Sequence, residues 1–400
     1  MGTINLNAFK DFFASKSGGG ILLLVCVIIS LLIANSPFGD SYANLLNTEI
    51  GKNFGNITLK FPILLWINDG LMAIFFLLVG LEIKRELVEG ELSSPQQAAL
   101  PVFAAVGGMV VPALLFGLFN NNTPTSNGWG IPMATDIAFA IAVLSLLGDR
   151  VPMVLKIFLT ALAIVDDLGA ILVIAVFYSS DIHLDYLAYA GGVLIFLIVL
   201  NRLKVMNYIF YIIPGIFMWY FVHHSGIHAT LAGVLTALTI PTTPDNVESP
   251  LEKLEHILTK PVNFLIMPVF ALANTNIRFE SGMVQGIFSD LGLGIMLGLL
   301  LGKPAGIFIM SWVSVKTGLG KLPKGTKWSQ IAGLGIIAGI GFTMSIFISM
   351  LSYQNPDYQT DAKFVILITS LMAGITGFFI LKKLFKRNTV NVGNRLKILK

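Results

Sequence analysis

The sequence predicts an all-α polytopic membrane protein with twelve transmembrane helices, of which helices 4 and 11 are interrupted. Hydrophobic residues make up 55% of the 400 residues and charged residues only 12%, about half of the charged share of a soluble domain. Apolar runs of about 18 to 25 residues recur along the whole chain, and no polar stretch between them is long enough to fold alone. We therefore expect one integral membrane domain over residues 1–400, with a short cytoplasmic N-terminus (1–17) and a basic cytoplasmic tail (382–400).

The apolar runs give the boundaries of the expected spans. These are residues 18–35, 62–83, 99–119, 128–147, 153–178, 186–201, 206–222, 226–240, 256–274, 291–313, 330–351 and 362–381. The first run follows Lys10 and Lys16, as in a secretory signal peptide, but no small-residue cleavage site follows it, so a retained helix is expected. The single cysteine, Cys26, excludes an internal disulfide and a cysteine metal cage.

The distribution of Lys and Arg among the short loops predicts the orientation of the spans. Alternate loops are rich in basic residues, namely Lys84, Arg85, Arg150, Lys156, Arg202, Lys204, Lys253, Lys260, Lys316, Lys321, Lys324 and Lys327. Basic loops stay on the cytoplasmic side, so both termini are expected in the cytoplasm. The net charge of +4 comes largely from the C-terminal tail and therefore reports topology, not binding of nucleic acid.

Two loops carry local structure in their sequence. Residues 47–60 alternate apolar and polar side chains around Gly51 and Gly55, which is compatible with an external β-hairpin and equally with an irregular loop. Residues 249–256 begin with Ser249 and Pro250 and place acids in the next turn, which is typical of the start of a helix.

Two spans contain helix-breaking residues near their middle. In the fourth span, Pro132 and its flanking glycines precede Thr135 and Asp136; in the eleventh, glycines crowd residues 333–341. Non-helical backbone is tolerated at membrane depth only where it is buried in protein or lines a cavity. The two breaks occupy matching places in spans 3–5 and 10–12, which have opposite orientation, and this is the pattern of inverted repeats in a transporter.

Four ionisable side chains lie deep in the expected spans: Asp136, Asp166, Asp167 and Lys303. Each Asp at a helix centre opposes insertion by about 2.5 to 3.5 kcal/mol, so an intramembrane acid is a functional candidate. Mutual pairing alone does not account for the set, because three acids face one base. A proton or a hard cation such as Na⁺ must supply the missing positive charge, and competition between the two at an alternately exposed site amounts to exchange.

Asp136 has a different expected role from the adjacent aspartates. The ends of half-helices carry partial charges, positive at N-termini and negative at C-termini. Asp136 is expected near two N-termini and Lys303 near two C-termini, where they would neutralise those charges. A plain N-cap role for Asp136 after the break at Pro132 is an equally good interpretation.

At these residues the chain closely resembles the NhaA family of bacterial Na⁺/H⁺ antiporters. The matching segments keep their order and cover most of the chain: Asn-Asp-Gly-Leu-Met over 68–72, Gly-Leu-Glu-Ile-Lys-Arg-Glu over 80–86, Thr-Asp-Ile-Ala-Phe-Ala over 135–140, Ala-Ile-Val-Asp-Asp-Leu-Gly-Ala over 163–170, Ser-Gly-Ile-His-Ala-Thr-Leu-Ala-Gly over 225–233, Gly-Lys-Pro over 302–304 and Gly-Ile-Gly-Phe-Thr-Met-Ser over 339–345.

The resemblance implies roles for particular residues. Asp166 and Asp167 would carry the cation and the protons, with Asp167 the principal Na⁺ ligand and with Thr135 and Asp136 close by. Lys303 would pair with Asp166 in the unloaded state. The resemblance further implies electrogenic exchange that moves more protons than Na⁺, acceptance of Li⁺, no cofactor apart from the transported ions, and a homodimer formed through the hairpin at 47–60.

The family is also activated at alkaline pH through a cytoplasmic charged cluster. On this chain the resemblance places that pH sensor on Glu82, Arg85, Glu86, Glu252, Glu255 and His256. A solvated charged face at helix ends explains the same residues more simply. Only one of the chain's five histidines falls in this set, so the sequence gives little support to a histidine-based sensor.

Other functions that use intramembrane acids fit this sequence less well. An intramembrane aspartic protease needs two Asp that face each other from separate helices, and here the pair is adjacent on one helix. A cation channel would need a ring of equivalent residues. The nearest alternative is a Na⁺-coupled symporter of an organic solute with a similar fold. We therefore do not expect an enzyme.

Overall fold

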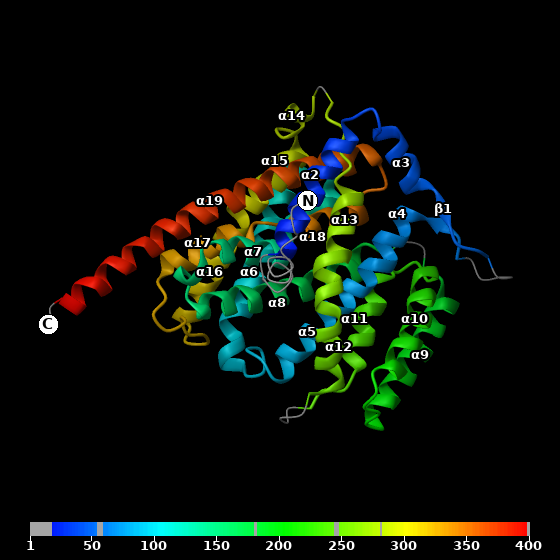
Figure 1. Cartoon of the computed structure of the whole chain (residues 1–400), viewed down its shortest axis with the longest axis horizontal. Coiled ribbons are helices and arrows are strands. Elements are labelled where there is room, and N and C mark those ends of the chain that lie inside the picture. The colour runs from blue at the N-terminus through cyan, green and yellow to red at the C-terminus, as the bar shows by residue number, and fades with distance from the viewer. Residues whose placement is uncertain (1–17, 54–58, 180–181, 244–247, 281, 398–400) are drawn as a thin grey trace, which may run out of the picture. The chain divides into compact units, whose positions relative to one another are not determined.

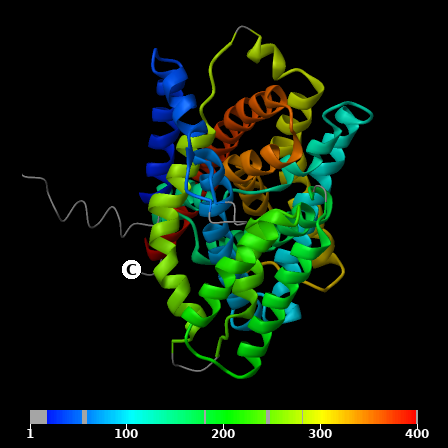
Figure 2. The same ribbon diagram turned by 90° about the vertical axis from the view of Figure 1, so that its right-hand side faces the viewer.

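The structure is a computed structural model that describes residues 18–53, 59–179, 182–243, 248–280 and 282–397. The described chain is mostly helical, as the ribbon diagrams show from two directions (Figures 1 and 2). It divides into two compact units. The described parts of 1–20, 94–170 and 281–400 form the first unit, and those of 21–93 and 171–280 form the second unit. Residues 1–17, for which a cytoplasmic N-terminus was expected, lie outside the described residues.

The described residues contain eight helices that are long and apolar enough to cross a membrane. Two further pairs of helices qualify together but are bent, by 112° between Gly18–Ala34 (α2) and Gly39–Asn47 (α3) and by 50° between Trp328–Ala338 (α17) and Phe342–Ser352 (α18). Two shorter apolar helices, Ile209–His224 (α10) and Thr230–Thr239 (α11), complete the set. The eight are Ile63–Val88, Pro95–Asn120, Ser126–Leu146, Met153–Phe177, Leu184–Arg202, Pro250–Asn274, Asp290–Lys316 and Pro356–Phe385. The expected all-α polytopic class is confirmed.

In the first unit, helix α6 (Pro95–Asn120) packs closely against α16 (Lys303–Lys316). Gly107 and Gly306 make this possible, because a Cβ on either residue would overlap the backbone carbonyl of the other. The other elements of this unit are η2 (Ser126–Met133), α7 (Ile137–Leu146), η3 (Gly148–Arg150), α8 (Met153–Phe177, up to the boundary at 170), α14 (Met283–Gly286), α15 (Asp290–Leu297), η5 (Gly298–Gly302), α17, α18 and α19 (Pro356–Lys397). Helix α19 continues through the described part of the basic tail (Figure 1).

Both expected interruptions are present in the first unit. In the fourth predicted span, the 3₁₀ turn η2 ends at Met133 and the helix α7 begins at Ile137, with an extended Asp136 between them. In the eleventh, α17 ends at Ala338 and α18 begins at Phe342. The two breaks meet, because the backbone N–H of Asp136 donates a hydrogen bond of 2.7 Å to the carbonyl of Ile340. A backbone donor freed by one break is thus satisfied by a carbonyl of the other break.

The second unit is built around the contact between α5 (Met72–Val88) and α11. Gly80 and Gly233 allow the two backbones to approach each other. Tyr211 and Met218 of α10, both fully buried, belong to the core cluster beside them. The remaining elements are α2, α3, α4 (Ile63–Leu65), the π-helical turn η1 (Trp66–Leu71), α9 (Leu184–Arg202), α12 (Pro250–Pro261), η4 (Val262–Ile266) and α13 (Met267–Asn274).

The loop over 47–60 contains part of a β-hairpin. The strand β1 (Glu49–Ile50) pairs antiparallel with β2 (Phe61–Pro62), and Lys60 forms an ion pair with Glu49 at 2.8 Å. Gly51 has a φ of 112°, a conformation that glycine adopts without strain. The strand alternative is therefore correct for the start of this loop, whose partner strand β2 follows directly after Lys60; residues 54–58 lie outside the described residues.

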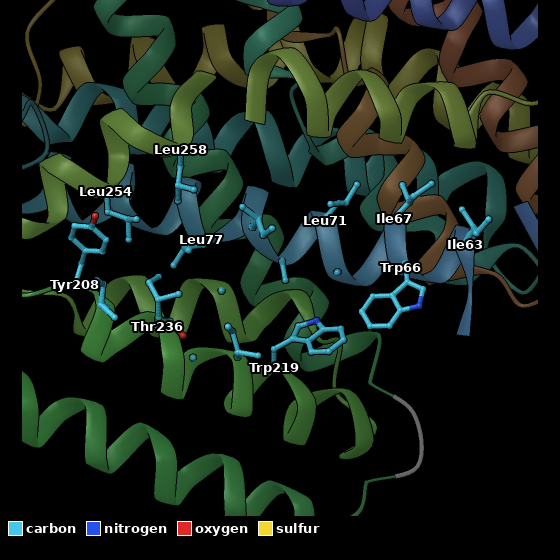
Figure 3. A pocket seen from close by; sticks show the side chains of 18 of the residues that line it. Ile63, Trp66, Ile67, Leu71, Leu77, Tyr208, Trp219, Thr236, Leu254 and Leu258 are labelled. Atoms are coloured by element: carbon cyan, nitrogen blue, oxygen red, sulfur yellow. The ribbon is translucent and has the colours of Figure 1, made fainter. Parts of the chain in front are cut away.

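An apolar groove of about 840 Å³ runs along the second unit between α5, α10 and α12 (Figure 3). Side chains such as Trp66, Leu77, Trp219 and Leu258 point into it. The groove is lined by apolar residues with only Tyr208 and Thr236 as polar ones, and none of its lining residues is charged. It therefore offers nothing that would hold a bare cation, and the candidate ion site must be sought elsewhere.

Candidate functional site

Asp136 lies at the point where the two interrupted spans meet. Its carboxylate accepts a hydrogen bond from the backbone N–H of Phe139 at 2.9 Å, so it caps the N-terminus of α7. The other carboxylate oxygen accepts the backbone N–H of Thr343 at 3.1 Å and the Thr343 hydroxyl at 2.5 Å. Because Thr343 belongs to the first turn of α18, one carboxylate serves two helix N-termini. The sequence suggested either an N-cap or a carboxylate near two helix N-termini. Asp136 is both.

Lys303 begins α16 and is completely buried, with 0% of its surface exposed. Its ammonium donates to the Asp166 carboxylate at 2.6 Å and to the backbone carbonyl of Met133 at the end of η2. The sequence predicted Lys303 beside two helix C-termini. The first is the end of η2 at Met133. At the second, the end of α17, the carbonyl of Ala338 accepts a hydrogen bond of 3.0 Å from the Thr135 hydroxyl and not from Lys303. The Thr135 hydroxyl lies within reach of both this carbonyl and Asp166 and has one proton to share between them, while the ammonium donates to Asp166 and Met133.

Asp166 is 1% exposed and accepts two hydrogen bonds at one carboxylate oxygen. These come from Lys303 and, at 2.7 Å, from the Thr135 hydroxyl. The other oxygen, Oδ1, is buried and has no hydrogen-bond partner among the described residues. A buried carboxylate oxygen without a partner is costly, and a bound proton, cation or water removes that cost.

Asp167 follows directly on the same helix and is also 1% exposed. Adjacent residues on a helix point about 100° apart, so the two carboxylates face different surroundings. The Lys303 ammonium nevertheless interacts electrostatically with both of them. The first unit thus buries three carboxylates, Asp136, Asp166 and Asp167, with one ammonium, and additional positive charge is needed to balance the group.

The ligands available here suit a hard cation. Carboxylate, hydroxyl and carbonyl oxygens are preferred by small alkali and alkaline-earth ions, whereas transition metals favour His and Cys. No group of three or more His, Cys, Asp or Glu side chains that could hold a metal ion occurs in the described part of the chain. A cation at Asp166 and Asp167 would therefore draw part of its coordination from groups such as the Thr135 hydroxyl.

The second unit contains the charged residues proposed as a pH sensor, and it brings only some of them together. Arg85 forms ion pairs with Glu255 at 2.9 Å and with Glu86 at 3.3 Å. Glu82 interacts electrostatically with all three. These four residues, which we call the Arg85 cluster, join the end of α5 to α12.

The other two proposed sensor residues are engaged in different contacts. Glu252 accepts the backbone N–H of Ser249 at 2.8 Å in a capping box that begins α12, as the sequence of that loop predicted. His256 pairs with Glu248 at 3.0 Å on an exposed surface and acts on Glu255 only through its charge. The sequence therefore placed both residues at the correct helix end but did not show that their own partners lie outside the Arg85 cluster.

Comparison with known proteins decides the family. The family model for Na⁺/H⁺ antiporter 1 matches residues 10–381. The chain is 64% identical over 379 residues to the Na⁺/H⁺ antiporter NhaA 2 of Flavobacterium johnsoniae, which covers 94% of this chain and 93% of that protein. It is 50% identical to the Na⁺/H⁺ antiporter NhaA of Flavobacterium psychrophilum, over 96% of this chain and 98% of the relative, and 50% identical to that of Shewanella amazonensis, over 95% and 98%. The chain belongs to the NhaA family of Na⁺/H⁺ antiporters.

Membership of the NhaA family confirms the resemblance inferred from the motifs. The relatives are named as transporters and not as enzymes. In this family member, the motif over 135–140 supplies Thr135 and Asp136, and the motif over 163–170 supplies the buried acids. The hydrogen bonds described above bring these two motifs together with Gly-Lys-Pro and Gly-Ile-Gly-Phe-Thr-Met-Ser in the first unit.

Sequence reasoning missed several polar contacts. Thr343 was part of a quoted motif, but nothing in its neighbours indicated that it binds Asp136. Lys84 donates to the carbonyls of Ile240 at 2.5 Å and Leu238 at 2.8 Å, so it caps the C-terminus of α11. Asp69 pairs with His223 at 3.1 Å beside the stacked rings of Trp66 and Trp219. The position of Asp69 within an apolar run was the feature of the sequence that could have pointed to its pair with His223.

Proposed function

We propose that this protein exchanges Na⁺ for H⁺ across the bacterial cytoplasmic membrane by alternating access. The observation that carries the proposal is the buried Asp166 carboxylate, which shares one oxygen between Lys303 and Thr135 and leaves the other without a hydrogen-bond partner among the described residues. Such a group gains from binding either a proton or a cation. The names of the relatives, all Na⁺/H⁺ antiporters, support exchange over the Na⁺-coupled uptake of an organic solute.

In the proposed cycle, Asp166 and Asp167 are the carriers of both ions. When they are protonated, Na⁺ finds no charge to bind; when they ionise, Na⁺ takes their oxygens together with the Thr135 hydroxyl, with Asp167 as the principal ligand. In the unloaded state the Lys303 ammonium pairs with the Asp166 carboxylate, and the entering cation replaces it there. If both acids load a proton and one Na⁺ replaces them, each cycle moves net charge, so exchange is electrogenic. Li⁺, a hard cation of the same charge, is expected to substitute for Na⁺.

We propose the full topology on the same basis. The eight long helices, the two bent pairs and the two shorter apolar helices would make twelve spans, with inverted repeats in spans 3–5 and 10–12. Both termini would face the cytoplasm. The hairpin of β1 and β2 would join two copies into a homodimer, and the Arg85 cluster would activate exchange as the cytoplasm becomes alkaline.

The experiment that tests exchange uses purified protein in proteoliposomes with an imposed pH gradient. We expect Na⁺ and Li⁺ to dissipate the gradient in the wild type, and more strongly as pH rises. Asp167→Asn should abolish this, because an amide neither releases a proton nor supplies the charge that holds Na⁺. The matched control is Asp290→Asn, which removes an exposed carboxylate at the start of α15 and should leave exchange intact.

The outcomes separate the proposal from its alternatives. Wild-type exchange in well-folded Asp167→Asn would remove this aspartate from the mechanism. If no cation moved protons at any pH in the wild type, exchange itself would be wrong, and a dependence of Na⁺ flux on an added organic solute would identify a symporter. A current that follows Na⁺ addition in the absence of other gradients would support electrogenic exchange.

A further inference from the structure

The loop between α16 and α17 carries unbalanced positive charge. The sequence contains no acidic residue between Lys303 and Asp357. Within this stretch the loop presents Lys316, Lys321, Lys324 and Lys327, and all four side chains are exposed. Among the described residues, none of the four forms an ion pair. These lysines therefore have their charge available for an anionic partner. We call the segment 316–327, which joins α16 to α17 in Figure 1, the basic loop.

Apolar side chains lie beside these charges. Leu319, at the turn of the basic loop, is 55% exposed, and Trp312 on the last turns of α16 is 43% exposed. The ammonium of Lys316 lies 4.4 Å above the Trp312 ring, a cation–π contact. Trp with a neighbouring Lys is typical of residues at the boundary between lipid tails and head groups.

A cleft opens next to the basic loop within the first unit. Its volume is about 470 Å³. One wall comes from the loop, through Gly318 and Leu319, and the other from the first turns of α6, mainly from Ala98, Ala99, Val102 and Phe103. None of the residues that line the cleft is charged. The cleft can therefore receive a hydrocarbon chain, while Lys316 and Lys321, which flank Gly318 and Leu319 in the sequence, can receive an anion.

We propose that the basic loop and this cleft form a binding site for an anionic phospholipid. The lysines contact the phosphate of the head group, and one acyl chain enters the cleft between Ala99 and Leu319. Charge complementarity selects the partner: a leaflet with anionic lipids attracts basic segments beside a span, by an amount that grows with each Lys. A soluble phosphate would use the lysines alone and leave the apolar cleft unfilled, which favours a lipid over a free anion. This inference is independent of the proposed transport cycle.

The test measures lipid binding by the full chain in detergent. Phosphatidylglycerol and phosphatidylcholine of identical acyl chains are titrated separately, and bound lipid is counted by native mass spectrometry at two salt concentrations. In the wild type, phosphatidylglycerol should bind about tenfold more tightly, and added salt should reduce that preference. Neutralising three lysines together, Lys321→Gln, Lys324→Gln and Lys327→Gln, should weaken phosphatidylglycerol binding by about tenfold or more and leave phosphatidylcholine binding unchanged.

Three controls isolate the site. Arg in place of the same three lysines keeps the charge and should keep the preference. Neutralising three exposed basic residues of the second unit, Arg202→Gln, Lys253→Gln and Lys260→Gln, should change phosphatidylglycerol affinity less than about threefold. Ala99→Trp fills the cleft without changing the charge and should weaken the binding of both lipids. Near-native circular dichroism of each variant shows that the fold is intact.

Specific outcomes would overturn the proposal. Equal binding of the two lipids by the wild type would exclude a role for head-group charge. Unaltered phosphatidylglycerol binding after loss of the three loop lysines, or an equal loss after the distant substitutions, would place the lipid elsewhere. Competition by inorganic phosphate at the affinity of the whole lipid would show an anion site that makes no use of the cleft.

Discussion

Two ion pairs of similar length differ in how much of their side chains is exposed to solvent. The Lys303–Asp166 pair measures 2.6 Å and its side chains are 0% and 1% exposed. The Arg85–Glu255 pair measures 2.9 Å, but its side chains are 35% and 13% exposed. The first leaves a buried carboxylate oxygen without a hydrogen bond, while the second belongs to a cluster with Glu82 and Glu86. Burial, and not distance, separates the two.

The comparison indicates what each pair is suited to do. Removing one partner of a buried pair leaves an uncompensated charge, which makes the pair sensitive to any ion that can replace Lys303 at Asp166. In a partly exposed pair water screens the charges, so the strength of the pair depends on the salt concentration. The buried pair is therefore suited to exchanging ions, and the Arg85 cluster to adjusting when that exchange occurs.

The largest effect should come from breaking the buried pair. Lys303→Ala leaves Asp166 buried without its ammonium, and we expect a loss of about 3 to 5 kcal/mol in the free energy of unfolding. Denaturation of the purified protein in detergent measures it. Arg85→Ala is the matched control and should lose less, because Arg85 and its partners keep some contact with water. Equal losses for the two variants would show that burial does not govern the difference.

Asp136 should give the next largest effect. Asp136→Ala removes the acceptor for the backbone N–H groups of Phe139 and Thr343, and with it the cap of two helices. We expect a loss of about 1 to 3 kcal/mol, since each such cap contributes about 0.5 to 2 kcal/mol. Thermal unfolding followed by circular dichroism is the measurement. Asp136→Asn keeps an acceptor oxygen and should lose less; an Asn variant as unstable as Ala would argue against capping.

A substitution in the Arg85 cluster should alter pH dependence more than stability. Glu255→Gln removes one negative charge from beside Glu82, which weakens the repulsion among the carboxylates of the Arg85 cluster. The pH at which exchange is half-activated should therefore move to a lower value, while the maximal rate is kept. Exchange in proteoliposomes, scanned over pH, measures both. Glu248→Gln, which removes the partner of His256 outside the cluster, should shift the midpoint less.

The smallest effect is expected at the hairpin. Lys60 and Glu49 pair at 2.8 Å, but their side chains are 49% and 54% exposed. Lys60→Ala should change the free energy of unfolding by less than about 1 kcal/mol. Chemical denaturation would detect a larger change, and such a change would mean that the surroundings of this pair exclude water as they do at Lys303.

Much of the fold followed from local sequence. The apolar runs gave the positions of the helices because a bilayer admits few alternatives, and Pro132 and Gly339 marked the interruptions because these residue types weaken a helix. The deep acids were visible because an apolar run makes any carboxylate conspicuous. The start of α12 after Ser249 was equally local.

The partners of these residues did not follow from local sequence. Lys303 and Asp166 are 137 positions apart, and only the resemblance to a family suggested that they meet. The bonds from Thr343 to Asp136 and from Thr135 to Ala338 depend on how the two breaks cross. Such contacts are set by the packing of whole helices, which spacing along the chain does not encode.

The close contact between α6 and α16 sets the position of the backbone that carries Lys303. Because Gly107 and Gly306 bring the two backbones together without intervening side chains, these helices cannot slide past each other without a clash. Lys303 lies one turn before Gly306, so its Cα lies next to this close contact, and its four-carbon stem carries the ammonium to Asp166. Separation of the ammonium from Asp166 would therefore require rotation within the Lys303 side chain or displacement of α8 relative to the α6–α16 pair.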